Sequence, residues 1–235
     1  MNKRKKLLPI NGSEIPYSEE PWRTHGIRSN NCYAYAVNDF ETFRVRKSVP
    51  GDRSGKSSEY HSYTNCKGLP ERVLSDNPGK IYKAKATEKC KKDYYKMMMV
   101  VAPKNQYGTS HGDFHFYKQH GKANHVVKQG DTCKSIAEMF DIPVSRIYKA
   151  KGANKPLRVG MKLIFNVNLF SHKRGWATGP LLKDACGKPI RDPRMACRKY
   201  GYDYSKYCCS FCVKNRGIDV GKTHPKVTQG GFKIF

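Results

Sequence analysis

The sequence predicts an α+β fold in which a small second unit is inserted into a larger first unit. Residues 96–102 form a continuous apolar run of strand length, and residues 113–118 alternate as a strand with one covered face does. Residues 125–165 change from a strand pattern to a helical pattern and back within a short span. With 235 residues, the chain is long enough for one large domain or two modest ones.

The first part of the chain is expected to hold one helix and long loops. Residues 1–20 are basic, polar and interrupted by proline, which favours a loosely packed N-terminal arm. A short helix is expected at residues 32–43, because Tyr, Ala and Val recur there behind a Ser-Asn-Asn run that can cap it. Residues 47–80 are rich in Gly, Ser, Pro and Lys, so loops should dominate there. Further short strands are expected after residue 168.

Residues 125–165 predict a strand–helix–helix–strand unit. A turn signal at Gly130-Asp131 precedes Thr132, which can cap the first helix. The apolar face of that helix consists of Ile136, Ala137 and Phe140. A second short helix is expected at residues 146–150, and residues 157–165 close the unit with a Gly turn and a strand. Such a short span can bury two helices only against one face of a two-stranded sheet.

The segments VVKQGDTCKSIAEMF, IPVSRIYKAKG and LRVGMKLIF occur in the order and spacing of the LysM family, so residues 125–165 resemble a LysM domain. The resemblance implies binding of an N-acetylglucosamine-containing polymer, either peptidoglycan or chitin. In that family, the acetamido groups of the sugar lie between the first strand–helix loop and the second helix–strand loop. Carried onto this chain, the glycan-binding residues are Gly130, Asp131, Thr132, Cys133, Asn154, Lys155, Pro156 and Leu157. The alternative is a docking or structural module whose groove is unused.

Outside that unit, one cysteine and two histidines form a candidate catalytic group. Cys32 stands at the predicted start of a helix, where the helix N-terminus would lower the pKa of its thiol and make it a better nucleophile. A histidine on a strand can take the proton, and a polar residue on the next strand can orient that histidine. If residues 125–165 are an insert, His115 and His172 lie on neighbouring strands of one hairpin.

This arrangement resembles the NlpC-type and CHAP-type cell-wall peptidases of the papain-like superfamily. The resemblance implies that Cys32 is the nucleophile, His115 the base and His172 its orienting partner. The alternative is that both histidines are satisfied strand residues and Cys32 is a core or disulfide thiol. Segments around the same three residues also resemble uncharacterised proteins of large DNA viruses.

The domain boundaries follow from the two resemblances. The host is a discontinuous papain-like domain formed by residues 21–122 and 168–215. The LysM-like module between these two segments occupies residues 123–167, and residues 216–235 form a C-terminal tail.

Nine cysteines raise the question of metal binding. Cys209-Ser-Phe-Cys212 has the spacing of a metal knuckle, and Cys186 and Cys197 could complete a zinc site. Disulfides are the alternative, and the odd total leaves at least one thiol outside any intramolecular set. No Gly-x4-Gly-Lys-Ser/Thr loop is present, and no cofactor is predicted.

The chain is strongly basic, with 45 Lys and Arg against 19 Asp and Glu and a net charge of +26. This charge favours anionic partners, among them acidic capsid proteins and viral DNA. The N-terminal apolar run is broken at Pro9, so it is too short for a signal peptide, and no window reaches membrane-spanning length. The sequence therefore predicts a protein that stays in the cytoplasm of the producing cell or is packaged in a virion.

Three functions are weighed on these grounds. The favoured one is glycan binding by the LysM-like module, attached to a cysteine-dependent cell-wall hydrolase domain. The alternative is a basic structural protein, a minor capsid component of a large DNA virus without catalytic activity. A third, nucleic-acid binding, predicts an affinity that falls steeply with salt.

Overall fold

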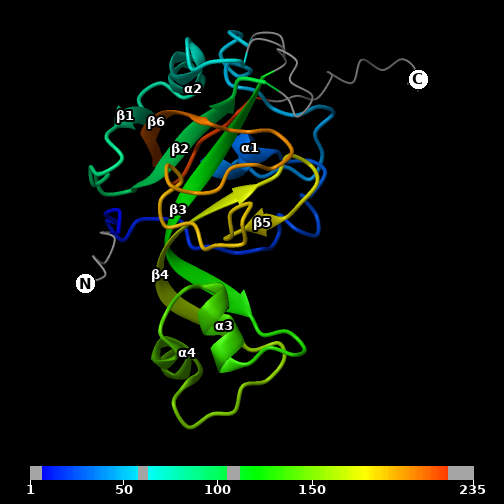
Figure 1. The fold of residues 1–235 in the computed structure, drawn as a ribbon, viewed down its shortest axis with the longest axis vertical. Helices are drawn as coiled ribbons and strands as arrows, with labels where there is room; N and C mark the ends of the chain where they lie inside the picture. The colour runs from blue at the N-terminus through cyan, green and yellow to red at the C-terminus, as the bar shows by residue number, and fades with distance from the viewer. Residues whose placement is uncertain (1–6, 58–62, 105–111, 222–235) are drawn as a thin grey trace.

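A computed structural model describes residues 7–57, 63–104 and 112–221, and it contains a six-stranded antiparallel sheet with helices (Figure 1). The α+β class that the sequence predicts is thereby confirmed. The strand order in the sheet is β1-β6-β2-β3-β4-β5. The strands are β1 (Ile81–Ala84), β2 (Tyr94–Ala102), β3 (Asp113–Val126), β4 (Lys162–Lys173), β5 (Pro180–Leu181) and β6 (Lys206–Lys214). The helices are α1 (Cys32–Val37), α2 (Leu69–Asp76), α3 (Cys133–Met139) and α4 (Val144–Lys151).

Strand β2 forms the centre of the host, as its continuous apolar run predicts. All nine of its residues are buried. Met97 and Met99 face a core that includes α1, whereas Met98 and Val100 face a second core with Tyr117 and Tyr204. Both faces of the sheet are therefore covered, α1 lying on one and residues from the 182–204 segment on the other.

Strands β3 and β4 are long because they belong to two units at once. In the host, β3 pairs with β2 on one side and with β4 on the other. Strands β3 and β4 then continue as a two-stranded ribbon that carries α3 and α4, at the bottom of Figure 1. The ribbon pairs Lys122 with Asn166 and Val126 with Lys162, beyond an irregularity between His120 and Lys122. The module is thus a continuation of the host sheet.

The N-terminal segment differs from the loosely packed arm that the sequence suggests, at least over residues 7–20. The Asn11 side-chain amide donates hydrogen bonds to three backbone carbonyls in the 90–94 segment. Further along, the Tyr17 amide donates to the Lys122 carbonyl, and the Asn124 amide donates to the Tyr17 carbonyl, both at 2.8 Å. The segment packs because it satisfies backbone groups of β3 at the start of the ribbon. Residues 1–6 lie outside the described residues.

Helix α1 is shorter than the 32–43 helix that the sequence predicts, because Asn38 adopts a left-handed conformation with φ 63° and ends it. Helix α2 lies within the 47–80 segment, where the sequence predicts that loops dominate. Proline at its start is compatible with a helix, since the first helical turn needs no donor there.

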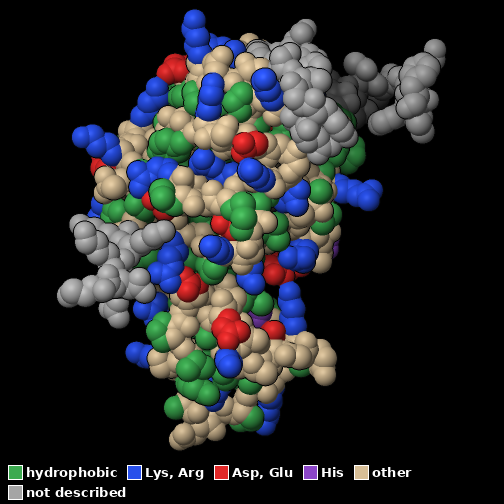
Figure 2. All heavy atoms as spheres, viewed as in Figure 1, with side chains coloured by type: hydrophobic (Ala, Val, Ile, Leu, Met, Phe, Trp, Pro, Cys, Tyr) green, Lys and Arg blue, Asp and Glu red, His purple; other side chains and the backbone are tan. Residues whose placement is uncertain are grey.

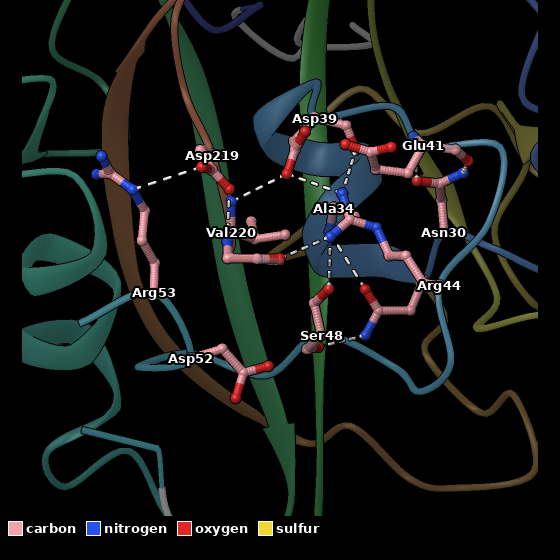
Figure 3. A network of polar contacts seen from close by, with 12 residues as sticks. Asn30, Ala34, Asp39, Glu41, Arg44, Ser48, Asp52, Arg53, Asp219 and Val220 are labelled. Carbon is pink, nitrogen blue, oxygen red and sulfur yellow. Dashed lines mark hydrogen bonds and ion pairs between the residues drawn. The ribbon is translucent and has the colours of Figure 1, made fainter. Parts of the chain in front are cut away.

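Arg44 holds the end of α1 to the C-terminal part of the described chain (Figure 3). Its guanidinium pairs with the Asp39 carboxylate at 2.8 Å and donates to the Gly221 carbonyl at 3.0 Å. The same carboxylate accepts from the Val220 amide at 2.9 Å. Part of the segment predicted as a C-terminal tail is therefore packed, and residues 222–235 lie outside the described residues.

Candidate functional site

The glycan-binding residues predicted from the sequence lie on two loops of a compact module. Its core contains Ile136, Phe140 and Ile147 from the helical side and Leu163 and Phe165 from β4. Cys133 and Leu157, one from each predicted loop, pack against this same core. The two loops are thus anchored in one apolar cluster.

The first loop is shaped by its own side chains. Gly130 has φ +83°, which favours glycine. The Asp131 carboxylate accepts hydrogen bonds from the His125 ring and the Lys128 amide, each at 2.8 Å. Burial acts to raise the pKa of Asp131, but these two hydrogen bonds outweigh it and hold the pKa below its usual value. Asp131 is therefore ionised and directed into the loop.

Thr132 caps α3, as the sequence predicts. Its hydroxyl accepts from the Ser135 amide at 3.0 Å, and the Ser135 hydroxyl accepts from the Thr132 amide at 2.9 Å. The side chains of Asp131 and Thr132 are consequently engaged within the loop, and they position the backbone that could meet a ligand.

The second loop is held from the end of α4, and the sequence analysis missed the residue that holds it. The Lys151 ammonium donates to the carbonyls of Gly152, Ala153 and Lys155, and the Lys155 amide donates to the Gly152 carbonyl at 2.9 Å. A lysine in the last helical turn, next to a glycine, is the signal that could have identified this contact. Asn154, Lys155 and Pro156 remain exposed.

Both loops present backbone donors that have no acceptor within the described part of the chain. On the first loop these are the amides of Gly130 and Cys133, and on the second those of Asn154 and Leu157. An acetamido carbonyl can accept a hydrogen bond from such amides, and the acetamido methyl can pack against the apolar side chains of Cys133 and Leu157. The arrangement suits a neutral amide-bearing ligand.

The candidate catalytic cysteine lies at the start of α1, as predicted, but its thiol is not activated there. Cys32 is buried, and its sulfur lies 3.8 Å from the Phe114 carbonyl oxygen. Burial raises the pKa of the thiol to about 12, with the Asp113 carboxylate adding to the effect. The expected lowering by the helix start is wrong, because the loss of solvent outweighs whatever the short helix contributes.

The two candidate histidines do meet. His115 Nε2 and His172 Nδ1 are 2.8 Å apart, and His172 Nε2 lies 3.1 Å from the Lys183 carbonyl oxygen. Since a carbonyl only accepts, His172 donates through Nε2, and His115 donates to His172 Nδ1. Burial lowers the pKa of His172 to about 4 and moves that of His115 well below its usual value, so both rings are neutral at pH 7.

Cys32 and His115 approach one pocket from different faces of the sheet. Phe114 and Phe116 pack with α1, whereas His115 contacts Tyr117, Tyr200 and Tyr204 on the other face. Both side chains nonetheless line a cavity of about 280 Å³. Within the described ranges, no hydrogen bond joins the Cys32 sulfur to either histidine.

The zinc candidate is contradicted by the pairing of its cysteines. Three disulfides are present: Cys66–Cys208, Cys90–Cys212 and Cys186–Cys197. The Cys209-Ser-Phe-Cys212 segment is an extended part of β6, so the side chains of Cys209 and Cys212 point to opposite faces and cannot grip one ion. Among the described residues, no group of three potential ligands could hold a metal.

The sequence predicts positive charge spread along the chain, and one face of the molecule shows such a spread. Figure 2 shows Lys and Arg side chains scattered over host and module alike on the face in view. Among the helices of the described residues, none is long and apolar enough to cross a membrane.

Comparison with known proteins identifies the module. Residues 125–166 match the LysM domain family, which confirms the resemblance drawn from the sequence. This family suggests binding of N-acetylglucosamine-containing glycans. No curated protein and no solved structure matches the chain.

Proposed function

We propose that the chain binds peptidoglycan or chitin through the loops at residues 130–133 and 154–157. The match of residues 125–166 to the LysM family carries the proposal. The free backbone amides on both loops support it, because they suit the acetamido group that repeats along both polymers.

In this proposal the host holds the module in a fixed position. Arg191 pairs with Asp141, Lys128 pairs with Glu19 at 2.6 Å, and the Tyr17 ring packs against Phe140. Together with the continuous strands β3 and β4, these contacts stop the module from swinging as a tethered domain would. Glycan binding therefore places the host at a defined position on the polymer.

The test is a pair of matched glycine variants in the full chain. Gly130 and Gly160 both have φ +83°, and an added Cβ would meet no atom within 4 Å at either position. Gly130→Ala and Gly160→Ala therefore introduce similar backbone strain, of about 1 kcal/mol. Only the first shifts the turn that presents the free amides of the groove. We expect at least a tenfold loss of affinity for chitohexaose in Gly130→Ala and little change in Gly160→Ala, measured by calorimetry.

Pull-down on insoluble chitin and on peptidoglycan then distinguishes the two polymers. Binding to either supports the proposal, provided that Gly130→Ala weakens it and Gly160→Ala does not. A wild-type chain that binds neither polymer nor chitohexaose would overturn it and leave the module a docking role.

A second candidate function is thiol-dependent hydrolysis of a cell-wall peptide or amide bond by the host. The observation that favours it is that Cys32 and His115 line one pocket. The reaction requires His115 to reach a thiol that is protonated in this arrangement. In this candidate, Cys32→Ala abolishes release of soluble fragments from peptidoglycan, while Cys209→Ala, a variant of another free cysteine, does not. Equal release by wild type and Cys32→Ala would remove the candidate.

A further inference from the structure

A cavity of about 240 Å³ lies in the host between α1, the 15–22 segment and β3. Aromatic side chains form much of its wall, and one lysine of β3 reaches it. The wall residues used below are Trp22, Tyr35, Phe40 and Lys118. It shares no lining residue with the Cys32 pocket, and none of the residues at 130–133 or 154–157 lines it.

Lys118 is buried, with 2 % of its surface exposed, yet no ion pair joins it to an acidic side chain of the described residues. Its ammonium lies 4.0 Å from the centre of the Tyr35 ring and 5.3 Å from that of Trp22. It donates one hydrogen bond, to the Asn38 side-chain oxygen at 3.2 Å. An ammonium has three donors, so two N–H groups have no oxygen or nitrogen acceptor among the described residues and face only the Tyr35 and Trp22 rings. Burial lowers the pKa of Lys118 to about 7.

The other buried lysines of the described chain show what a purely structural lysine looks like here. The Lys96 ammonium donates to three carbonyls, and the Lys173 ammonium donates to two carbonyls at 2.7 Å. Neither lines one of the cavities described above. Lys118 thus combines unused donors with a cavity, and a buried donor without an acceptor is costly.

The mouth of the cavity is lined by residues that are open to solvent, and one of them is acidic. Ser18, Glu20, Pro21 and Asn38 line it and are at least partly exposed. The Glu20 carboxylate is engaged by the amide and hydroxyl of Thr24 and forms no ion pair with Lys118.

We propose that this cavity binds a small aromatic monocarboxylate, with the carboxylate on the Lys118 ammonium and the ring against Trp22 and Phe40. A carboxylate supplies two acceptors to the two unused N–H groups and compensates the buried charge. An aromatic ring suits walls made of ring edges and faces, and the cavity is too small for a polymer.

The test uses benzoate as the probe and Trp22 as the reporter. The chain has two tryptophans, so Trp176→Phe leaves Trp22 alone to report on the cavity. In that background, benzoate should change the Trp22 emission in a saturable way, and neutral benzamide should bind at least tenfold more weakly. Lys118→Met should abolish the benzoate response, whereas Lys122→Met, at an exposed position of the same strand, should retain it.

A second measurement does not depend on how the Lys118 variant folds. In the wild type, benzoate should protect Lys118 from acetylation by acetic anhydride, as read by peptide mass spectrometry, and leave Lys122 unprotected. An unsaturable response, equal affinity for benzoate and benzamide, or no protection of Lys118 would overturn the proposal. Chitohexaose binding is measured in parallel on the same proteins. A failure of the carboxylate proposal is thereby distinguished from a failure of the proposed glycan binding.

Discussion

Three histidines are buried and uncharged inside the host, and each is satisfied as a neutral ring. His115 and His172 bond to each other, while His120 donates to the Ile15 carbonyl at 2.7 Å and accepts from the Ser171 hydroxyl at 2.6 Å. Burial is the main cause that lowers the pKa of each, to about 3 for His120 and about 4 for His172. These residues couple the stability of the fold to pH.

The coupling makes the chain less stable in mild acid. In the unfolded chain a histidine binds its proton near pH 6.5, whereas the folded chain resists protonation until about pH 4 or below. The histidine contribution to stability is therefore complete above pH 6.5 and is lost as the pH falls toward 4. His120 and His172 should each remove about 2 kcal/mol between pH 6.5 and 5, and His115 acts in the same direction. Urea denaturation at the two pH values measures the loss.

A variant isolates this effect from the titration of carboxylates. His120→Gln keeps a side chain that can donate and accept but cannot become charged in this range. Its unfolding free energy should fall less between pH 6.5 and 5 than that of the wild type, by about 2 kcal/mol. The same loss in both proteins would show that His120 does not resist protonation in the folded state.

At the scale of elements, local patterns predicted those parts of the fold that local sequence determines. The run at 96–102 lies in β2, and Thr132 caps α3. Residues 113–118 begin β3 as expected, but both faces of the strand are buried there instead of one. Each of these signals lies within a few residues, so it can be found without knowing the rest of the chain. The module was recognised for the same reason, because its four elements are consecutive in the sequence.

Elements that depend on distant partners were not predicted. Strand β6 inserts between β1 and β2, and two of its three cysteines, Cys208 and Cys212, pair with Cys66 and Cys90. The spacing of Cys209 and Cys212 alone could not distinguish a metal knuckle from an extended strand with disulfides. The N-terminal segment likewise packs through distant partners, which are backbone groups of β3 and carbonyls of the 90–94 segment.

In the candidate sites too, features set by neighbouring residues were predicted and features set by distant contacts were not. The loops at 130–133 and 154–157 were located from the sequence. The donors that they present are backbone amides, and whether such an amide lacks an acceptor depends on every other contact of its loop. The sequence predicted a lowered pKa for the Cys32 thiol. Its burial against β3, which raises that pKa, could not be predicted from the residues around it. The papain-like character of the host remains a prediction.

At the scale of the whole molecule, two disulfides enclose the central hairpin and the module. Cys66–Cys208 and Cys90–Cys212 join residues 142 and 122 positions apart, and both loops contain all of β2, β3, the module and β4. Cys186–Cys197 joins residues only 11 positions apart. A longer closed loop restricts the unfolded chain more, so the bridges should differ in what they contribute.

Removing one long-range bridge and the short-range bridge separately tests this difference. Because Cys66–Cys208 already closes the same segment, Cys90–Cys212 additionally closes a loop of only about 28 residues, through residues 66–90 and 208–212. On loop entropy alone, Cys90→Ala with Cys212→Ala should therefore lower the unfolding free energy by about 4 kcal/mol, and Cys186→Ala with Cys197→Ala by about 3 kcal/mol. Guanidinium denaturation of the two double variants and the wild type measures both values. If the short-range variant loses as much stability as the long-range one, loop closure does not govern the contribution of these bridges. Retained chitohexaose binding in the long-range variant would further show that the module keeps its groove without that bridge, as expected from a core composed largely of residues 123–167.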